Sequence, residues 1–234
     1  MKLLTIRSIS FAAATLAMAA SANALTVNWS GLQGTSKLDF SANAISLFKA
    51  NGGKVEALGN TTPLPEAGAT SAWSFSLPIT SITVTPALKI GAGQASGSAL
   101  DIVRRTIDEE TGAVITSGIV LANFKLDYIG HQVLADATTH GATTKPMFAV
   151  YDFNVATPLA LKYKFPLSIT GHEVLDKLKL TSAAVDLFAA SLGLSGDAVI
   201  GLVRDTDFGT LTQDIAVKVR KPAVSNKPYV VAAP

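Results

Sequence analysis

The sequence contains no cysteine, three histidines and two tryptophans among its 234 residues. The absence of cysteine excludes disulfides, thiolate metal sites, cysteine nucleophiles and a lipidated N-terminal cysteine. None of the histidines is spaced two or four residues from another, which is the spacing of paired zinc ligands. A nucleophile elbow, an HExxH motif and a phosphate-binding loop are also missing, so the sequence carries no catalytic signature.

Charge is scarce and balanced. Charged residues make up 15% of the chain. Lys2 and Arg7 are among the 19 basic residues, and without them the basic residues balance the 17 acidic ones. Proteins that bind nucleic acid cluster positive charge, so we expect no nucleic-acid partner. A surface with so little charge is poorly protected against self-association, and assembly with itself or with a cell-surface partner is therefore one expectation.

The N-terminus has the pattern of an export signal. Lys2 and Arg7 precede an uncharged apolar run over residues 9–20, and Ala22 and Ala24 then form a small-x-small pair. This pattern predicts a signal peptide over residues 1–24, with cleavage after Ala24. The alternative, a buried N-terminal helix, would normally carry a polar face. We therefore expect an exported protein that works in the periplasm or outside the cell.

The rest of the chain is predicted to have no transmembrane segment, because no second run of about 18 apolar residues follows. Instead, short runs of Val, Ile, Thr, Leu and Phe are broken by Gly, Pro, Asn and Ser about every ten residues, as in an all-β sandwich. Residues 98–106 and 113–128 are predicted to form a hairpin around the turn at 108–112. We predict one antiparallel β-sandwich over residues 25–220, followed by a C-terminal tail over 221–234.

Two segments break the period of two and are predicted to be short helices that cap the sandwich. One covers 42–51 with Ser41 as its N-cap, and the other covers 182–192 with Thr181 as its N-cap. The matching positions are Leu38/Leu178, Ala44/Ala184, Leu47/Leu187, Phe48/Phe188, Ala50/Ala190 and Gly53/Gly193. A duplication explains the match, and so do the constraints that capping and helical periodicity place on any two helices. In either case each helix is too short to be stable alone and should cover an open end of the sheet.

Several segments resemble secreted bacterial domains of the HtaA-like type. The resemblance spans most of residues 35–204, and its segments are Phe75-Ser76-Leu77-Pro78-Ile79-Thr80, Gly97-Ser98-Ala99-Leu100, Leu121-Ala122-Asn123-Phe124-Lys125-Leu126-Asp127 and Val133-Leu134-Ala135-Asp136. Some members of that family bind haem through a tyrosine supported by a histidine, and others have no assigned ligand. The tyrosines of this chain are not matched to the family's ligand motif, so the resemblance implies no particular haem ligand.

Tyr128 and Tyr151 lie on neighbouring predicted strands, and His131 follows Tyr128 by three residues. A phenolate at Tyr128 or Tyr151 would bind haem iron if a histidine accepted its proton. The alternative is ordinary aromatic packing with an exposed hydroxyl. His140 and His172 are expected in solvated loops, and the sequence itself predicts no cofactor.

Asp205 and Asp207 begin a D-x-D-x-G pattern that is typical of part of a calcium loop. The pattern lacks a third ligand and the later bidentate glutamate. A simple turn between strands is the alternative.

Taken as a whole, these patterns favour a non-enzymatic protein that binds a partner or has a structural role at the cell envelope or in the extracellular matrix. The first alternative is a small-ligand carrier, with haem as the specific case. The second is an enzyme of unknown reaction, because a catalytic carboxylate pair depends on tertiary geometry and leaves no sequence motif.

Overall fold

The structure is a computed structural model that describes residues 24–69, 71–86, 89–164 and 168–232. Except for Ala24, the predicted signal peptide lies outside the described residues, and the first strand begins at Leu25. Among the described residues, no helix has the length and apolar character needed to cross a membrane.

The described residues form twelve strands and three helices. The strands are β1 (Leu25–Asn28), β2 (Leu32–Phe40), β3 (Gly53–Gly59), β4 (Thr62–Pro63), β5 (Ser74–Pro78), β6 (Ser81–Val84), β7 (Ile90–Ile107), β8 (Val114–Asp127), β9 (Gln132–Thr139), β10 (Lys145–Lys164), β11 (Ser168–Leu180) and β12 (Gly209–Val219). The helices are α1 (Ala42–Ala50), α2 (Ser182–Leu192) and α3 (Asp197–Asp205).

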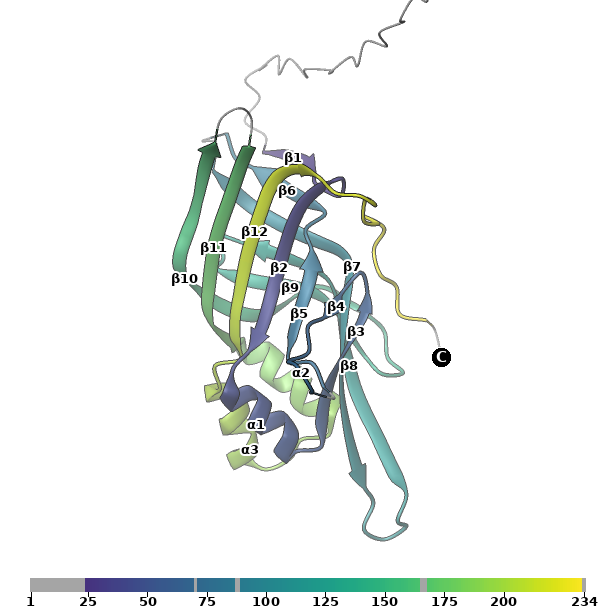
Figure 1. Ribbon diagram of the computed structural model, residues 1–234. Coiled ribbons are helices and arrows are strands. Elements are labelled where there is room, and N and C mark those ends of the chain that lie inside the picture. Colours follow the sequence, from purple (N-terminus) through teal and green to yellow (C-terminus); the bar gives the residue numbers. More distant parts are fainter. Residues whose placement is uncertain (1–23, 70, 87–88, 165–167, 233–234) are drawn as a thin grey trace, which may run out of the picture.

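All strands belong to one antiparallel sheet in the order β1-β6-β7-β8-β9-β10-β11-β12-β2-β5-β4, with β3 paired to β7. The sheet curls into a half-barrel (Figure 1). The prediction of an antiparallel all-β protein is confirmed, but the described strands form one continuous curled sheet rather than the two stacked sheets of the expected sandwich. The reason lies in the long strands, since β7 pairs with β6 along its first part and with β3 along its second.

The segment that joins β5 to β6 draws the curled sheet together. The backbone N–H of Ile79 donates to the carbonyl of Gly34 on β2 at 2.9 Å. The next residue, Thr80, donates its N–H to the carbonyl of Gln94 on β7 at 2.8 Å. Because two adjacent residues bond to β2 and β7 in turn, these strands lie close together although they are far apart in the order of the sheet.

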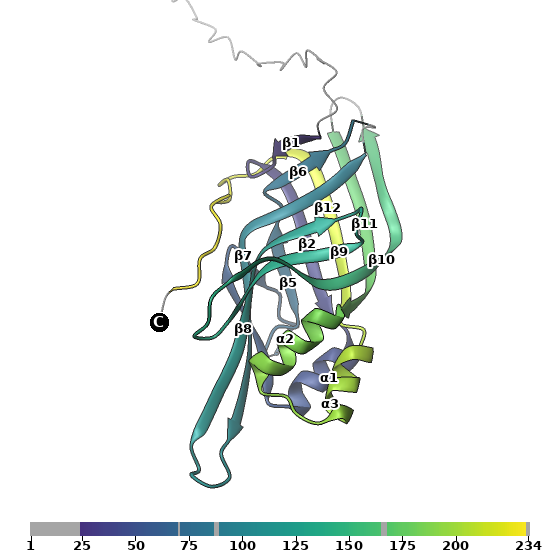
Figure 2. The same ribbon diagram turned by 180° about the vertical axis from the view of Figure 1, so that it is seen from behind.

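Both predicted helices are present and cover one end of the curled sheet (Figures 1 and 2). The hydroxyl of Ser41 accepts the N–H of Ala44 at 3.1 Å, and that of Thr181 accepts the N–H of Ala184 at 3.1 Å. The sequence prediction missed α3, whose Gly201 lowers the helix propensity of a short segment. The expected pair of capping helices is therefore a group of three.

The two strand-cap-helix units are alike in their contacts as well as in their sequence. Ala44 and Ala184 are both fully buried. Each capping hydroxyl also donates to a backbone carbonyl, Ser41 to Asp207 at 2.5 Å and Thr181 to Ala149 at 2.8 Å. Each unit thus ties the start of a helix to a neighbouring part of the chain in the same way.

The predicted C-terminal tail is docked on the outer face of β7 and β8. Asn123 accepts the N–H of Tyr229 at 2.7 Å and donates its side-chain amide to the carbonyl of Tyr229 at 3.0 Å. The side-chain amide of Asn60 donates a hydrogen bond to the carbonyl of Ser225 at 2.7 Å. Tyr229 and Val231 pack on the cluster of small buried residues Ala99, Val120 and Ala122.

The predicted hairpin extends beyond the rest of the sheet as an arm, residues 105–116, that is visible below the helices in Figure 1. Asp108 accepts bonds from the N–H groups of Glu110 and Thr111 and from the hydroxyl of Thr111. These bonds, with the Thr111 backbone first, lower the pKa of Asp108. The turn is therefore organised locally, without help from the core.

Candidate ligand-binding site

A row of polar side chains crosses the inner face of the curled sheet. Glu173 on β11 lies opposite Gln213 on β12, and Gln213 lies opposite Ser36 on β2. All three residues are buried, with exposed fractions of 3%, 5% and 8% respectively. Burying polar groups among apolar side chains costs free energy unless each group finds a hydrogen bond.

Only part of this row is paired. Ser36 donates its hydroxyl to Oε1 of Gln213 at 2.6 Å. Tyr128, the residue just after β8, donates its hydroxyl to Oε2 of Glu173 at 2.5 Å. The amide nitrogen Nε2 of Gln213 is buried and has no hydrogen-bond partner among the described residues. An unused donor therefore faces the interior.

Burial also affects the protonation of Glu173 and Tyr128. Burial raises the pKa of Glu173, and this is opposed by the bonds from Tyr128 and from the backbone N–H of Leu159. Burial, together with the nearby Glu173 charge, raises the pKa of Tyr128 far above its ordinary value. Tyr128 thus keeps its proton and acts as a donor to the carboxyl group.

Two small cavities flank the polar row. The first, of about 20 Å³, is lined by Ile79, Ile82, Ile90, Gly93, Tyr128, Leu159, Glu173, Gln213 and Ile215. The second, of about 30 Å³, lies nearer the helices and has Ser36, Leu178 and Tyr151 in its lining. Gly93 lines both cavities. Each has room for a group the size of a water molecule.

Beyond the first cavity, β10, β11 and β12 continue toward the end of the sheet opposite the helices (Figure 1). Their cross-strand register carries the inner face in that direction, and apolar residues occupy it there. We call four of them the apolar strip: Leu161, Tyr163, Ile169 and Val217. Their exposed fractions are 61%, 63%, 39% and 44% respectively. Neighbouring exposed apolar side chains of this kind often mark a binding surface.

The structure places the predicted haem residues at different depths. Tyr151 is buried, with its ring 5.6 Å from that of Phe208. His131 is exposed, and its ring lies 5.7 Å from that of Phe153, which also lies 6.2 Å from the ring of Tyr128. Burial raises the pKa of Tyr151 as it does that of Tyr128, which opposes the phenolate form that binds iron. A role for these residues in haem binding stays a prediction.

The predicted calcium residues lie at the end of α3. Asp205 is exposed, whereas Asp207 accepts the N–H of Gly209 at 2.9 Å. In the part of the chain that the structure describes, no group of three histidine or acidic side chains is arranged to hold a metal ion. The alternative of a simple turn accounts for Asp207, and the calcium prediction has no third acidic ligand.

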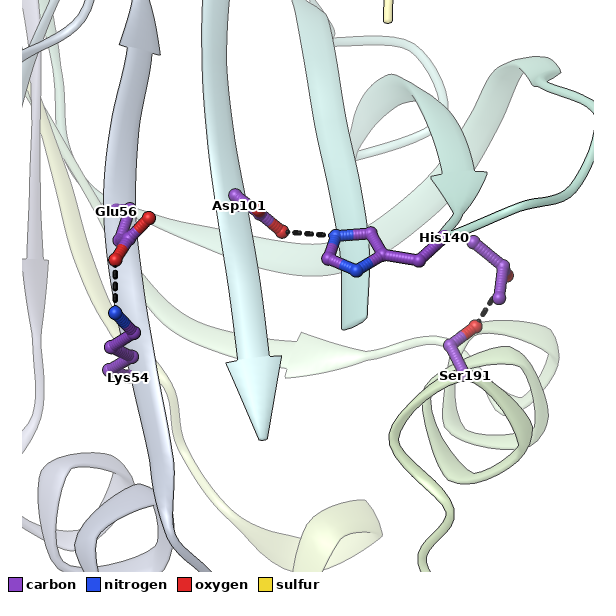
Figure 3. Close-up of polar contacts among 6 residues, drawn as sticks. Lys54, Glu56, Asp101, His140 and Ser191 are labelled. Atoms are coloured by element: carbon purple, nitrogen blue, oxygen red, sulfur yellow. Dashed lines mark hydrogen bonds and ion pairs between the residues drawn. The ribbon is translucent and has the colours of Figure 1, made fainter. Parts of the chain in front are cut away.

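The two remaining histidines are paired with aspartates on the outer face. Nε2 of His140 lies 2.8 Å from Oδ1 of Asp101 (Figure 3), and Nδ1 of His172 lies 2.8 Å from Oδ1 of Asp214. His172 is part of β11, so the expectation of a loop is wrong for this residue. His140 lies exposed in the turn that directly follows β9, as expected.

Two other polar contacts lie near the His140–Asp101 pair. Lys54 and Glu56 form an ion pair on β3 (Figure 3). Ser191 on α2 bonds to the hydroxyl of Thr139 at 2.6 Å. The Thr139–Ser191 bond links the end of β9 to α2, whereas the ion pair lies within one strand.

Sequence reasoning missed Ser36, Glu173 and Gln213. The signal was present, because each occupies a position in the strand alternation that otherwise faces the core. Glu173 is two residues from Leu175, and Gln213 lies between Leu211 and Ile215. A polar residue at such a position needs a partner or a purpose.

No family model matches the chain, and no curated protein matches it. Among solved structures, the chain is similar to the C-terminal domain of HtaA from Corynebacterium glutamicum. The two share 12% sequence identity with a TM-score of 0.47, over 80% of this chain and 98% of that domain. The weak resemblance noted from the sequence is thereby confirmed. A likeness at this level assigns no ligand and no residue role.

Proposed function

We propose that this chain is a non-enzymatic binding protein that takes a small, mostly apolar molecule at the end of its curled sheet opposite the helices. The observation that carries the proposal is the unpartnered Nε2 of Gln213, buried beside a cavity with apolar walls. An unpaired buried donor costs about 1–3 kcal/mol, which a ligand that accepts its hydrogen bond would recover. A place at the cell envelope is part of the proposal and rests on the predicted signal peptide.

The apolar strip supplies the rest of the binding energy. A ligand whose polar end enters the first cavity would lay its apolar part over Leu161, Tyr163, Ile169 and Val217. Each methylene group removed from water in this way contributes about 0.8 kcal/mol. We infer a binding role rather than a catalytic one because the carboxyl group of Glu173 is held by Tyr128 and Leu159.

Gly93 offers a direct test. A Cβ built at this position would meet no heavy atom within 4 Å, and Gly93 lines both cavities, so a valine there should take up space beside them. We expect Gly93→Val to fold normally and to bind the neutral apolar dye N-phenyl-1-naphthylamine at least tenfold more weakly than the unmodified protein, as measured by fluorescence titration. Gly201→Ala, at an equally open position on α3, is the control and should bind normally. Equal dye affinity in Gly93→Val and the unmodified protein would count against the proposed site.

Haem is the specific alternative ligand, and its binding is measured by absorbance rather than by dye fluorescence. Exposed His131 and the tyrosine Tyr128 both contact Phe153, which is the observation that favours it. A saturable Soret shift that disappears in Tyr128→Phe would assign the iron to that phenol. A shift that survives both Tyr128→Phe and Tyr151→Phe would exclude these two tyrosines as ligands, and the absence of any shift would exclude haem.

We also propose that two copies associate through the arm, residues 105–116. Ile107 and Val114 are cross-strand partners with exposed fractions of 70% and 66%. An isolated two-stranded hairpin is marginally stable, so a partner would stabilise it. A second copy suits the arm because, in an antiparallel arrangement, the exposed Arg105 at the base of one arm would face Glu109 at the tip of the other.

Size-exclusion chromatography tests this association. We expect an elution volume that falls as protein concentration rises, and Ile107→Lys should restore a constant monomer volume, because it places a charge in the apolar contact. Lys54→Ala, outside the arm, is the control. A constant monomer volume for the unmodified protein over the whole concentration range would contradict the association.

A further inference from the structure

We propose that the natural ligand is an apolar alcohol, whose hydroxyl group lies between Gln213 and Glu173. This inference rests on the proposed function and specifies the chemistry of its ligand. Gln213 and Glu173 are direct cross-strand partners on β12 and β11, and both line the first cavity.

The two side chains make opposite demands on a ligand. Nε2 of Gln213 is an unpaired donor, so it requires an acceptor. The carboxyl oxygens of Glu173 accept bonds from Tyr128 and Leu159 and, when ionised, can accept more. Directly opposite side chains have Cβ atoms about 4.5–5.5 Å apart, so one small group can reach both. The group must therefore accept from one side and donate to the other, as a hydroxyl does.

Carboxylate and ammonium end groups each satisfy one demand only. A carboxylate accepts from Gln213 but has no proton for Glu173, and the two carboxyl groups repel each other whenever both are ionised. The residues that line this cavity include no lysine or arginine to offset that repulsion. An ammonium group donates to Glu173 but leaves the Gln213 donor unpaired. A plain hydrocarbon satisfies neither side chain.

Size and shape agree with this chemistry. The cavity of about 20 Å³ has room for a group no larger than water, which suits a hydroxyl and leaves the carbon chain outside. The path outward is apolar, because the side chains of Ile215 and Leu161 both lie over Gly171. A Cβ built at Gly171 would meet atoms of both. Ile215 lines the cavity and Leu161 belongs to the apolar strip, so the chain of the alcohol passes directly from one to the other.

A matched series of ten-carbon compounds tests the end group. We expect 1-decanol to displace N-phenyl-1-naphthylamine from the protein at a concentration at least tenfold lower than decanoate or decylamine. Equal or stronger displacement by decanoate or decylamine would overturn the alcohol assignment and leave the proposed apolar site intact. Failure of the dye and all three compounds to bind would instead overturn the proposed function itself.

A variant series separates the polar row from general apolar binding. Gln213→Met keeps a side chain of similar length and removes the donor, so we expect the dye to bind normally while the preference for decanol over decanoate falls at least fivefold. Gln33→Met changes an exposed glutamine on β2 and is the matched control. If Gln213→Met fails to fold, Glu173→Gln provides the second variant, with the same loss expected. An unchanged preference in a folded variant would contradict the proposed contact.

Discussion

Replacing Gly209 with alanine is expected to destabilise the protein by about 3–5 kcal/mol, because strain and steric overlap act together at this position. Gly209 has a φ of 131°, a backbone conformation that residues with a side chain rarely adopt. An added Cβ would also overlap the backbone carbonyl oxygen of Asp39, which belongs to the paired strand β2. The backbone of Asp39 cannot move aside without disturbing the start of α1. Chemical denaturation followed by circular dichroism measures the loss.

Gly201→Ala is a control of opposite sign. Gly201 lies inside α3, and a Cβ built there meets no atom within 4 Å. Alanine is favoured over glycine within a helix by about 0.5–1 kcal/mol, so this substitution should stabilise the protein. If both substitutions changed the free energy of unfolding by similar amounts, the conformational argument for Gly209 would be wrong.

The second large effect is expected at Arg104, whose guanidinium joins the ends of two helices. Its Nε donates to the carbonyl of Asn51, the C-cap of α1, at 3.1 Å. Its Nη1 donates to the carbonyls of Leu192 and Gly193 at the end of α2, at 3.0 and 2.7 Å. Carbonyls at helix C-termini lack partners within the helix and carry partial negative charge, so a single cation stabilises both ends.

We expect Arg104→Ala to lower the free energy of unfolding by about 2–3 kcal/mol, since charge-assisted bonds to otherwise unpaired carbonyls are lost. Arg104→Lys should recover only part of this, because an ammonium group lacks the planar fork that reaches both helices. Lys218→Ala removes an exposed cation on β12, outside the arm, and should change stability by less than about 0.5 kcal/mol. Equal effects of the two alanine variants would show that Arg104 does not act through the helix ends.

The elements that were predictable are those whose signals are local. Ser41 and Thr181 each precede an apolar pattern of period 3.6, so the two helices and their caps could be placed from a few neighbouring residues. The turn over residues 108–112 is another such case, since Asp108 and Gly112 specify it within one hairpin. The helix α3 was missed because its pattern is short and interrupted by Gly201.

The candidate site was largely unpredictable for a related reason. Tyr128 was singled out from the sequence, but its partner Glu173 is 45 residues away, and Ser36 is 177 residues from Gln213. Nothing in a local window shows which strands become neighbours. A polar residue at a strand position that otherwise faces the core was a detectable signal. That signal identifies the residue but not the group that the residue contacts.

The sequence by itself determined that this protein is β-rich, contains no cysteine chemistry, and has two capped helices beside its strands, because composition, periodicity and capping act over a few residues. Only the tertiary structure decided that the strands form one curled sheet, that the C-terminal segment docks on its outer face, and that Ser36, Gln213 and Glu173 form a row inside it. Those features depend on which distant segments pair and in what register. Pairing is set by the burial of the whole inner face, and no single segment encodes it.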